Sequence, residues 1–165
     1  RIFGKTSRMS GGLVKMNAGL KSYEIFNYIH SIKTKDGYIK KEDIQYSYRH
    51  TNIDTIIYEV VLNCRYGFSK TQSELFKKMR ENQPQIPSAG SCFKNPKDDA
   101  AGRLIEAVGL KGFHKGDMSF SQEHANFLVN NKNGTFDEAT YLINLAKQKV
   151  KDAFGIDLEE EIIIY

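Results

Sequence analysis

A run of small and polar residues from Ser88 to Pro96 has the composition of a ligand-binding loop. Its small residues let the backbone turn tightly and come close to a ligand. The hydroxyl of Ser91, the ammonium of Lys94 and the amide of Asn95 then supply polar groups along a short length of chain. We predict a functional loop held by a rigid scaffold, with a plain surface turn rich in glycine and serine as the alternative.

Two further groups near this run could bind anions. Lys94 and Asn95 together could contact a diphosphate or the edge of a base, and support of the turn by capping explains the pair equally well. Arg49, which follows Tyr48, offers a planar guanidinium suited to a carboxylate or a phosphate. A surface arginine beside a strand is the alternative for Arg49.

A histidine and an acidic cluster occupy the last third of the chain. His124 can serve as an acid, a base or a donor, or it can simply be satisfied by the backbone. No cysteine or second histidine stands at ligand spacing from it, so the sequence predicts no metal site. Glu159, Glu160 and Glu161 precede a run of isoleucines. A buried carboxyl there would have a raised pKa and could donate a proton, and a solvated strand edge is the alternative.

A glycine-rich stretch near the start contains Gly12, Asn17 and Gly19. Such glycines indicate backbone packed against a flat partner, for which a flavin or a nucleotide phosphate is a candidate. A tight turn between buried elements is the alternative. The stretch is not the GxGxxG fingerprint, so that motif gives no support for dinucleotide binding.

Composition limits the class of protein. The chain has 165 residues, of which 40% are hydrophobic, and a net charge of +4. These values are typical of a globular protein, and no apolar run approaches the length of a membrane span. Cys64 and Cys92 have neither metal nor disulfide spacing, which suits a reducing cytoplasm. The positive charge is spread along the chain without a basic cluster, so neither a membrane nor a nucleic acid is an expected partner.

The first part of the chain is predicted to be rich in strands. Apolar residues between Glu24 and Ile32, followed by Asp36-Gly37, indicate a β-hairpin. Alternation continues from Glu42 to Thr51. The segment from Ile56 to Tyr66 is predicted to be a strand buried on both faces. A change of composition near Gly67 indicates a domain boundary.

The second part alternates helices with strands. Capping boxes predict helices that start at Thr71 and Thr135, the second of which ends at Gly155. A further helix is predicted from Asp99 to Val108 and stops at Gly109. Short strands are predicted at 125–130 and at 158–165. The second of these is acidic at first and apolar after that. Helices and strands mix without regular βαβ alternation, so the predicted class is α+β.

Taken together, the motifs resemble those of one enzyme family. The motifs that carry the resemblance occur in the same order as in that family: Gly12-Leu-Val-Lys-Met-Asn-Ala-Gly19, Tyr48-Arg49, Pro87-Ser-Ala-Gly-Ser-Cys-Phe-Lys-Asn-Pro96, Ala101-Gly-Arg-Leu-Ile-Glu106, His124-Ala-Asn-Phe-Leu-Val-Asn130 and Leu158-Glu-Glu-Glu-Ile162. The series is similar to the UDP-N-acetylenolpyruvoylglucosamine reductases (MurB), in their shorter form. The resemblance covers nearly the whole chain from Gly11 onward.

The resemblance implies FAD-dependent reduction of UDP-N-acetylglucosamine enolpyruvate to UDP-N-acetylmuramate with NADPH as reductant. The product is a precursor of peptidoglycan, so the family serves cell-wall growth, cell shape and division. Ser91 would protonate the α-carbon, while Glu161 and Arg49 would lie at the substrate carboxyl. The resemblance also assigns substrate-binding and flavin-lining residues. The former are Lys94, Asn95 and His124, and the latter are Gly12, Asn17 and Gly19.

The resemblance also predicts the division of the chain. Residues 1–66 would be the C-terminal part of a flavin-binding domain, with a mixed or antiparallel sheet, and residues 67–165 a small α+β substrate-binding domain. The family carries a flavin-binding lobe ahead of the glycine-rich stretch, and Ser7-Arg-Met-Ser10 stands where a Pro-Gly pair is usual. We therefore expect an isolated chain of this length to be free of flavin and inactive. A non-catalytic UDP-sugar-binding module is the alternative, and a nucleic-acid binder is a more distant one.

Overall fold

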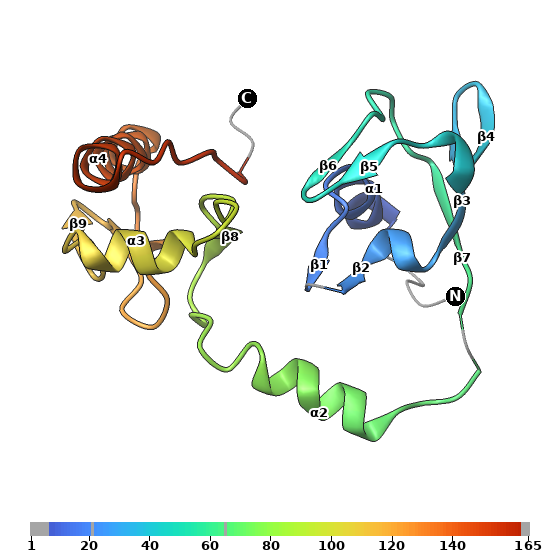
Figure 1. The fold of residues 1–165 in the computed structure, drawn as a ribbon, viewed down its shortest axis with the longest axis horizontal. Helices are drawn as coiled ribbons and strands as arrows, with labels where there is room; N and C mark the ends of the chain where they lie inside the picture. Colours follow the sequence, from blue (N-terminus) through green and yellow to red (C-terminus); the bar gives the residue numbers. More distant parts are fainter. Residues whose placement is uncertain (1–6, 21, 65, 163–165) are drawn as a thin grey trace. The chain divides into compact units, whose positions relative to one another are not determined.

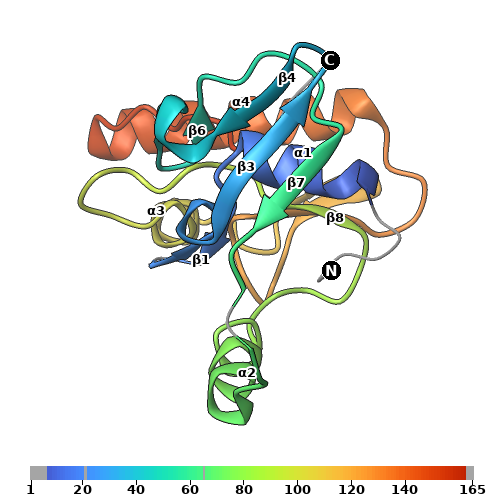
Figure 2. The same ribbon diagram turned by 90° about the vertical axis from the view of Figure 1, so that its right-hand side faces the viewer.

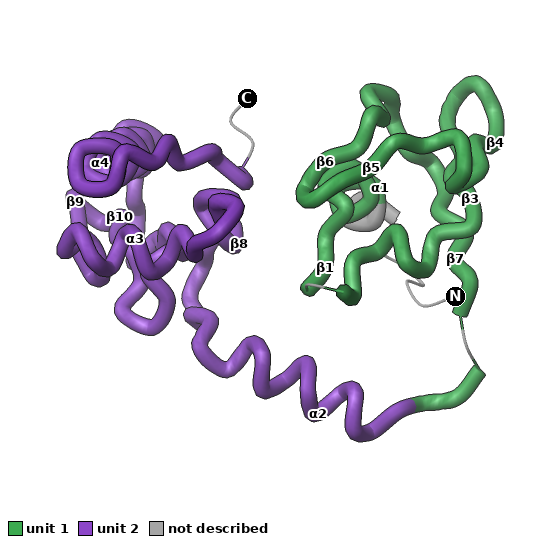
Figure 3. The backbone as a smooth tube through the Cα atoms, in the orientation of Figure 1, with its two compact units in different colours: residues 1–68 green, residues 69–165 purple. Residues whose placement is uncertain are grey.

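The chain forms two compact units, Arg1–Phe68 and Ser69–Tyr165, in a computed structural model (Figure 3). The structure describes residues 7–20, 22–64 and 66–162. Among the described residues, each unit has its own cluster of buried hydrophobic side chains. The assignment of the first unit to a flavin-binding domain and of the second to a substrate-binding domain remains a prediction.

Short strands and one face of a helix form the first unit. Its elements are α1 (Ser7–Lys15), β1 (Gly19–Leu20), β2 (Tyr23–Glu24), the 3-10 turn η1 (Ile25–Asn27), β3 (Ile29–Thr34), β4 (Gly37–Lys40), the 3-10 turn η2 (Lys41–Asp43), β5 (Tyr46–Ser47), β6 (His50–Thr51) and β7 (Glu59–Leu62). Strands β4, β3 and β7 form an antiparallel sheet in that order, and β1–β2 and β5–β6 are separate antiparallel pairs. Helix α1 lies behind β3 and β7 in Figure 2. Side chains of α1, η1 and β3 fill the core under the sheet, with Val14, Phe26, Ile29 and Ile32 fully or almost fully buried.

The predicted hairpin is confirmed, and the strand predicted after it is mostly wrong. Strand β3 pairs with β4 so that Thr34 lies opposite Gly37, as the Asp36-Gly37 turn requires. Of the described residues between 56 and 66, those of β7 alone form a strand, and that strand lies at the edge of the sheet. Ile56 and Tyr58 are 69% and 59% exposed. Burial on both faces fails because the sheet is small and has a single core beneath it.

The paired glycines do not form the tight turn that was the alternative prediction for this stretch. Gly11 and Gly12 lie inside helix α1, and the turn follows the helix, where the N–H of Ala18 donates to the carbonyl of Leu13. Asn17 occupies this turn with a positive φ of 43°. Gly19 is required there, because a Cβ would lie 2.5 Å from the Tyr23 carbonyl oxygen.

The second unit is an antiparallel sheet covered by helices (Figure 1). Its elements are α2 (Lys70–Lys78), β8 (Ser88–Ser91), α3 (Ala101–Ala107), β9 (His114–Lys115), β10 (Met118–Phe120), β11 (Phe127–Asn130) and α4 (Phe136–Phe154). The strand order is β8-β11-β10-β9. The core contains Phe93, which follows β8, together with Leu104 of α3, Phe120 of β10 and Leu142 of α4. The predicted α+β class, with helices and antiparallel strands, is therefore confirmed.

Local helix signals are confirmed for α3 and α4. Thr135 forms the predicted capping box with Glu138, and Gly155 ends α4 in the left-handed region with a φ of 69°. Gly109 follows α3 with a φ of 76°. The start of α2 is wrong by two residues, because Ser69 rather than Thr71 accepts the capping bond, from the N–H of Gln72. None of the described helices combines the length and apolar composition that a membrane crossing requires.

Two segments of the second unit differ from prediction. The stretch expected to be a loop begins as a strand, because β8 pairs with β11 along the edge of the sheet. The expected C-terminal strand is reduced, within the described residues, to an isolated bridge between Phe93 and Glu160. Residues 161 and 162 bend after that bridge, and residues 163–165 lie outside the described part of the chain.

Candidate functional site

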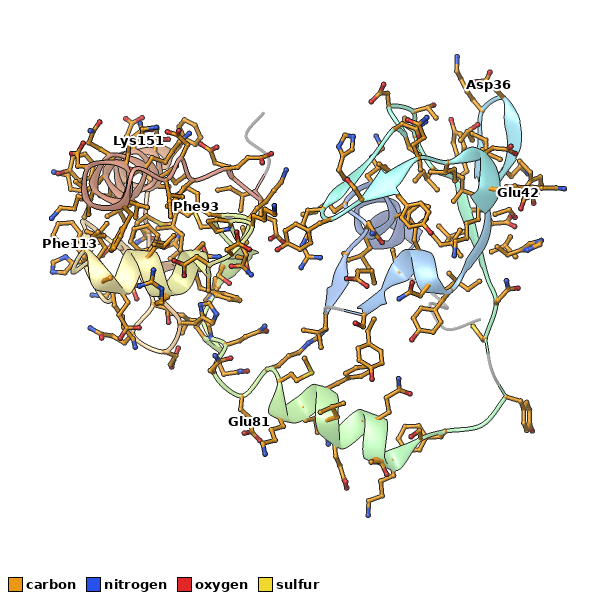
Figure 4. All side chains as sticks on the ribbon, viewed as in Figure 1. Asp36, Glu42, Glu81, Phe93, Phe113 and Lys151 are labelled. Atoms are coloured by element: carbon orange, nitrogen blue, oxygen red, sulfur yellow. The ribbon has the colours of Figure 1, made fainter. Side chains whose placement is uncertain are left out.

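Ser91 is the last residue of β8 and is held by the residues around it. It pairs with Phe127 of β11 and is half-buried. The next two residues, Cys92 and Phe93, are fully buried in the core of the unit. Figure 4 shows Phe93 inside the second unit, between α3 and α4. The Ser91 hydroxyl is therefore carried by a strand end that is anchored directly beyond it.

The acidic C-terminal segment lies beside this strand end. The N–H of Glu161 donates to the Cys92 carbonyl over 2.9 Å, and the N–H of Lys94 donates to the Glu159 carbonyl over 2.8 Å. These bonds flank the bridge between Phe93 and Glu160. The structure thus brings the main chain of Glu161 next to the residue that follows Ser91, although the two are far apart in the sequence.

The three glutamates have different surroundings. Glu159 is exposed and pairs with the Lys94 ammonium. Glu160 is half-buried and its carboxylate accepts from Lys147 of α4 at 2.8 Å. Burial acts to raise the pKa of Glu160, but hydrogen bonds from Lys147 and the backbone outweigh burial and lower it. The hypothesis of a buried carboxyl with a raised pKa is therefore wrong for Glu160.

Lys94 and Asn95 each have a structural partner. The Asn95 side-chain oxygen accepts from the N–H of Ala101 at 3.0 Å, at the first turn of α3. This bond confirms capping as one role of Asn95. Lys94 is mostly buried along its stem and pairs with Glu159. Neither contact tests the predicted binding of a substrate.

His124 is packed between α3 and β11. Its Nδ1 accepts from the N–H of Asn126 at 3.2 Å, and its ring meets the edge of Phe127 with centroids 5.0 Å apart. A Cβ at Gly102 would lie 3.1 Å from the His124 ring, so the glycine lets α3 approach closely. Burial lowers the pKa of His124, and the charge of Lys111 acts in the same direction. The backbone-satisfied alternative is confirmed at Nδ1.

The lowered pKa of His124 predicts a loss of stability in mild acid. The unfolded chain protonates this histidine near its ordinary pKa of about 6.5, whereas the folded chain resists protonation. Above that pH, His124 does not change the free energy of unfolding. As the pH falls below it, the unfolded chain binds the proton more readily and the folded chain loses stability. Urea unfolding of the 165-residue chain between about pH 7.5 and 5.5 should therefore show a smaller loss of stability for His124→Gln than for the wild type. Equal losses in the two chains would contradict the effect of burial.

Cys92 is not suited to nucleophilic chemistry. Burial, with a further contribution from Glu160, raises the pKa of its thiol to about 12. The thiol is therefore protonated at neutral pH and behaves as a small apolar group. It lines a cavity of about 620 Å³ between β8 and α4, together with Leu128, Phe136 and Ile143. This apolar lining is unsuited to a nucleotide diphosphate, and Ser91 does not line the cavity.

Arg49 lies in the first unit, at the tip of the β5–β6 hairpin. It has a positive φ of 54°, which places a non-glycine residue in the left-handed region. Its Nη1 donates to the Gly19 carbonyl at 3.0 Å, and its guanidinium lies over the Tyr48 ring at 5.1 Å. These contacts hold the guanidinium in a half-buried position.

The predicted flavin-lining residues divide into two kinds. Asn17 is buried and serves the fold, since its amide donates to the Ser47 carbonyl and accepts from the N–H of Phe26. Gly19 is likewise explained by its contact with β2. Gly12 is exposed, and a Cβ there would meet nothing within 4 Å. Nothing in the described chain requires glycine at position 12, and its contact with a flavin remains a prediction.

Asn126 has a larger part in the site than the sequence indicated. It is 3% exposed, and its amide bonds both the N–H and the carbonyl of Phe93. A polar residue at the start of an apolar segment was the available signal, but its partner could not be read from the sequence. Among the described residues, no group of three or more His, Cys, Asp or Glu side chains is placed to hold a metal ion.

The fold and the site define the second unit as a small α+β domain with a polar site at the end of β8. The family model for the C-terminal domain of UDP-N-acetylenolpyruvoylglucosamine reductase matches residues 82–165. The chain therefore belongs to the UDP-N-acetylenolpyruvoylglucosamine reductase family.

Individual relatives extend the match over nearly the whole chain. It is 50% identical over 154 residues to the reductase of Campylobacter jejuni strain RM1221, which covers 93% of the chain and 60% of the relative. The Helicobacter hepaticus reductase is 49% identical over 154 residues, covering 93% of the chain and 59% of the relative. A crystal structure of the reductase from Thermus caldophilus matches with a TM-score of 0.78 and 28% identity, over 99% of the chain and 64% of that structure. The chain spans about 60% of the length of the curated relatives it matches.

Proposed function

We propose that the complete protein containing this chain reduces UDP-N-acetylglucosamine enolpyruvate to UDP-N-acetylmuramate for peptidoglycan synthesis in the cytoplasm. Family membership supports this reaction. The observation that carries it is the hydrogen bond from the N–H of Glu161 to the carbonyl of Cys92, beside Ser91. This bond brings the main chain of Glu161 next to the residue that follows Ser91, although the two lie far apart in the sequence.

FAD is the proposed cofactor and NADPH the proposed reductant. When bound, the flavin supplies hydride to the β-carbon of the enolpyruvyl ether. Of this chain's residues, exposed Gly12 would allow the closest approach of such a group. Asn17 and Gly19 would act indirectly, by holding the turn after α1. The remainder of the flavin site would come from the part of the relatives that this chain does not span.

The residues of this chain would handle the proton and the developing negative charge. Addition of hydride at the β-carbon leaves negative charge on the α-carbon and the adjoining carboxylate. The Arg49 fork would neutralise that carboxylate, and Ser91 would give its hydroxyl proton to the α-carbon. Glu161 would act as a hydrogen-bond and proton donor toward the substrate carboxyl.

The second unit would also bind the nucleotide sugar. The Lys94 ammonium pairs with exposed Glu159 and retains further donors for a phosphate. Asn95 is fixed at the start of α3 by its bond to Ala101, which would orient its amide N–H groups. In His124, Nδ1 accepts a backbone bond, so a neutral ring carries its proton on Nε2 as a donor.

Absorption and turnover of the complete gene product test the proposal. We expect flavin bands in the purified protein and oxidation of NADPH only when the enolpyruvyl substrate is present, with the lactyl ether as product. The 165-residue chain should lack the flavin bands. Binding of the nucleotide sugar by a flavin-free complete protein, without turnover, would instead support a non-catalytic UDP-sugar-binding module.

A further inference from the structure

The amide of Asn126 holds the main chain of Phe93 from both sides. Its Nδ2 donates to the Phe93 carbonyl at 2.8 Å, and its Oδ1 accepts from the Phe93 N–H at 3.0 Å. The carbonyl of Asn126 also accepts from the N–H of Cys92 at 2.7 Å. Because Asn126 and Phe93 are both buried, water cannot replace these bonds.

This contact replaces a strand ladder that breaks at the same place. In the pairing of β8 with β11, Phe127 lies opposite Ser91 but Val129 lies opposite Ser88, so the register shifts within the ladder. Strand β8 ends at Ser91. Beyond it, the N–H and the carbonyl of Phe93 both bond to the Asn126 side chain. The Asn126 amide thus continues the edge of β11 by two hydrogen bonds where regular pairing has stopped.

The segment held by Asn126 separates the two proposed catalytic groups. On its other side, the Cys92 carbonyl accepts from the N–H of Glu161. Ser91 directly precedes this segment, and Glu161 bonds to it. We propose that Asn126 is a positioning residue for the reduction, which sets the Ser91 hydroxyl and the Glu161 carboxyl relative to each other. This inference rests on the proposed function.

Asn126→Asp is the sharpest variant, because aspartate has the same shape but cannot donate to the Phe93 carbonyl. The lost bond and the repulsion between two oxygens should displace the segment. A displacement of that size typically slows a reaction about 10–100-fold. In the complete protein, we expect this loss in the reoxidation of reduced flavin by the enolpyruvyl substrate. Reduction of the flavin by NADPH should keep its wild-type rate.

Asn130→Asp provides a matched control at the other end of β11, four residues further along the chain. The Asn130 side chain accepts from the N–H groups of Lys132 and Gly134, so it supports the turn before α4 rather than Phe93. Both half-reactions of this variant should stay within about twofold of the wild type, since its contacts do not reach Ser91 or Glu161.

Combination with Ser91→Ala distinguishes positioning from general damage. If Asn126 acts through Ser91, the double variant should reoxidise no more slowly than Ser91→Ala alone. Additive losses, an unchanged Asn126→Asp, or slowing of both half-reactions would overturn the inference. So would a variant that fails to melt cooperatively, because Asn126 would then serve the fold as a whole. A wild-type protein that the substrate does not reoxidise would instead contradict the proposed function itself.

Discussion

Replacement of Ser91 by alanine in the complete protein is expected to slow reoxidation of the reduced flavin by the enolpyruvyl substrate about 10²–10⁴-fold. The variant removes the proposed proton donor and nothing else of the strand, because the backbone of β8 is held by β11 and by the buried residues after it. Reduction of the flavin by NADPH precedes this proton transfer and should be unchanged. Rapid-mixing absorbance measurements of the two half-reactions give both rates.

Ser88→Ala is the matched control for this prediction. Ser88 opens the same strand and is exposed, and its hydroxyl accepts a long bond from the N–H of Gly90. Loss of that local bond should leave both half-reactions within about twofold, because it does not touch the anchored end of β8. Equal slowing of reduction and reoxidation in Ser91→Ala would show that Ser91 is not the proton donor.

Glu161→Gln is expected to slow the same half-reaction about 10²–10³-fold. Glutamine keeps the size of the side chain and leaves the main-chain bond to Cys92 available. The glutamine amide still donates hydrogen bonds, but it cannot pass a proton toward the substrate carboxyl as negative charge develops there. The measurement is single-turnover reoxidation at saturating substrate, with flavin reduction by NADPH recorded on the same sample.

Glu160→Gln tests whether the effect belongs to position 161. Glu160 is the adjacent glutamate and bonds Lys147 of α4, so its loss should affect stability more than chemistry. Reoxidation by this variant should stay near the wild-type rate. A comparable fall in both variants would mean that the acidic segment acts through its fold or net charge, and it would remove Glu161 from the mechanism.

Local signals predicted α3 and α4 well because each signal acts over a few residues, whereas the glycine-containing helix α1 was not predicted. Thr135 and Glu138 cap α4 with bonds between neighbours, and Gly155 ends it with a conformation that glycine adopts readily. The β3–β4 hairpin was equally predictable, since its turn residues lie between the strands they join. At α2 the competing cap Ser69 stood two residues before the predicted one.

Elements that depend on distant partners were not predictable in the same way. Strand β8 contains serine and glycine, which have low strand propensity, and its pairing with β11 decides its conformation. The segment around β7 was predicted to be buried on both faces because it is rich in apolar residues, but β7 is an edge strand over a single core and is only half-buried. Tertiary context overrides local propensity in both cases.

The candidate site likewise has features that the sequence predicts and features that depend on distant partners. The sequence motifs singled out Ser91, Glu161 and Arg49 as residues with suitable chemistry. They did not show that Glu161 lies beside Cys92, or that Asn126 bonds both sides of Phe93, because such pairings form between segments far apart in the chain. The roles of these residues in catalysis remain proposals.

A crystal structure of the complete protein with UDP-N-acetylglucosamine enolpyruvate bound tests the central claim most directly. The claim is that one strand-end hydroxyl and one C-terminal carboxyl act on the same enolpyruvyl group. We predict the Ser91 hydroxyl within about 3.5 Å of the α-carbon and the Glu161 carboxyl within about 3.2 Å of a substrate carboxyl oxygen. An enolpyruvyl group bound out of reach of both side chains would contradict the account.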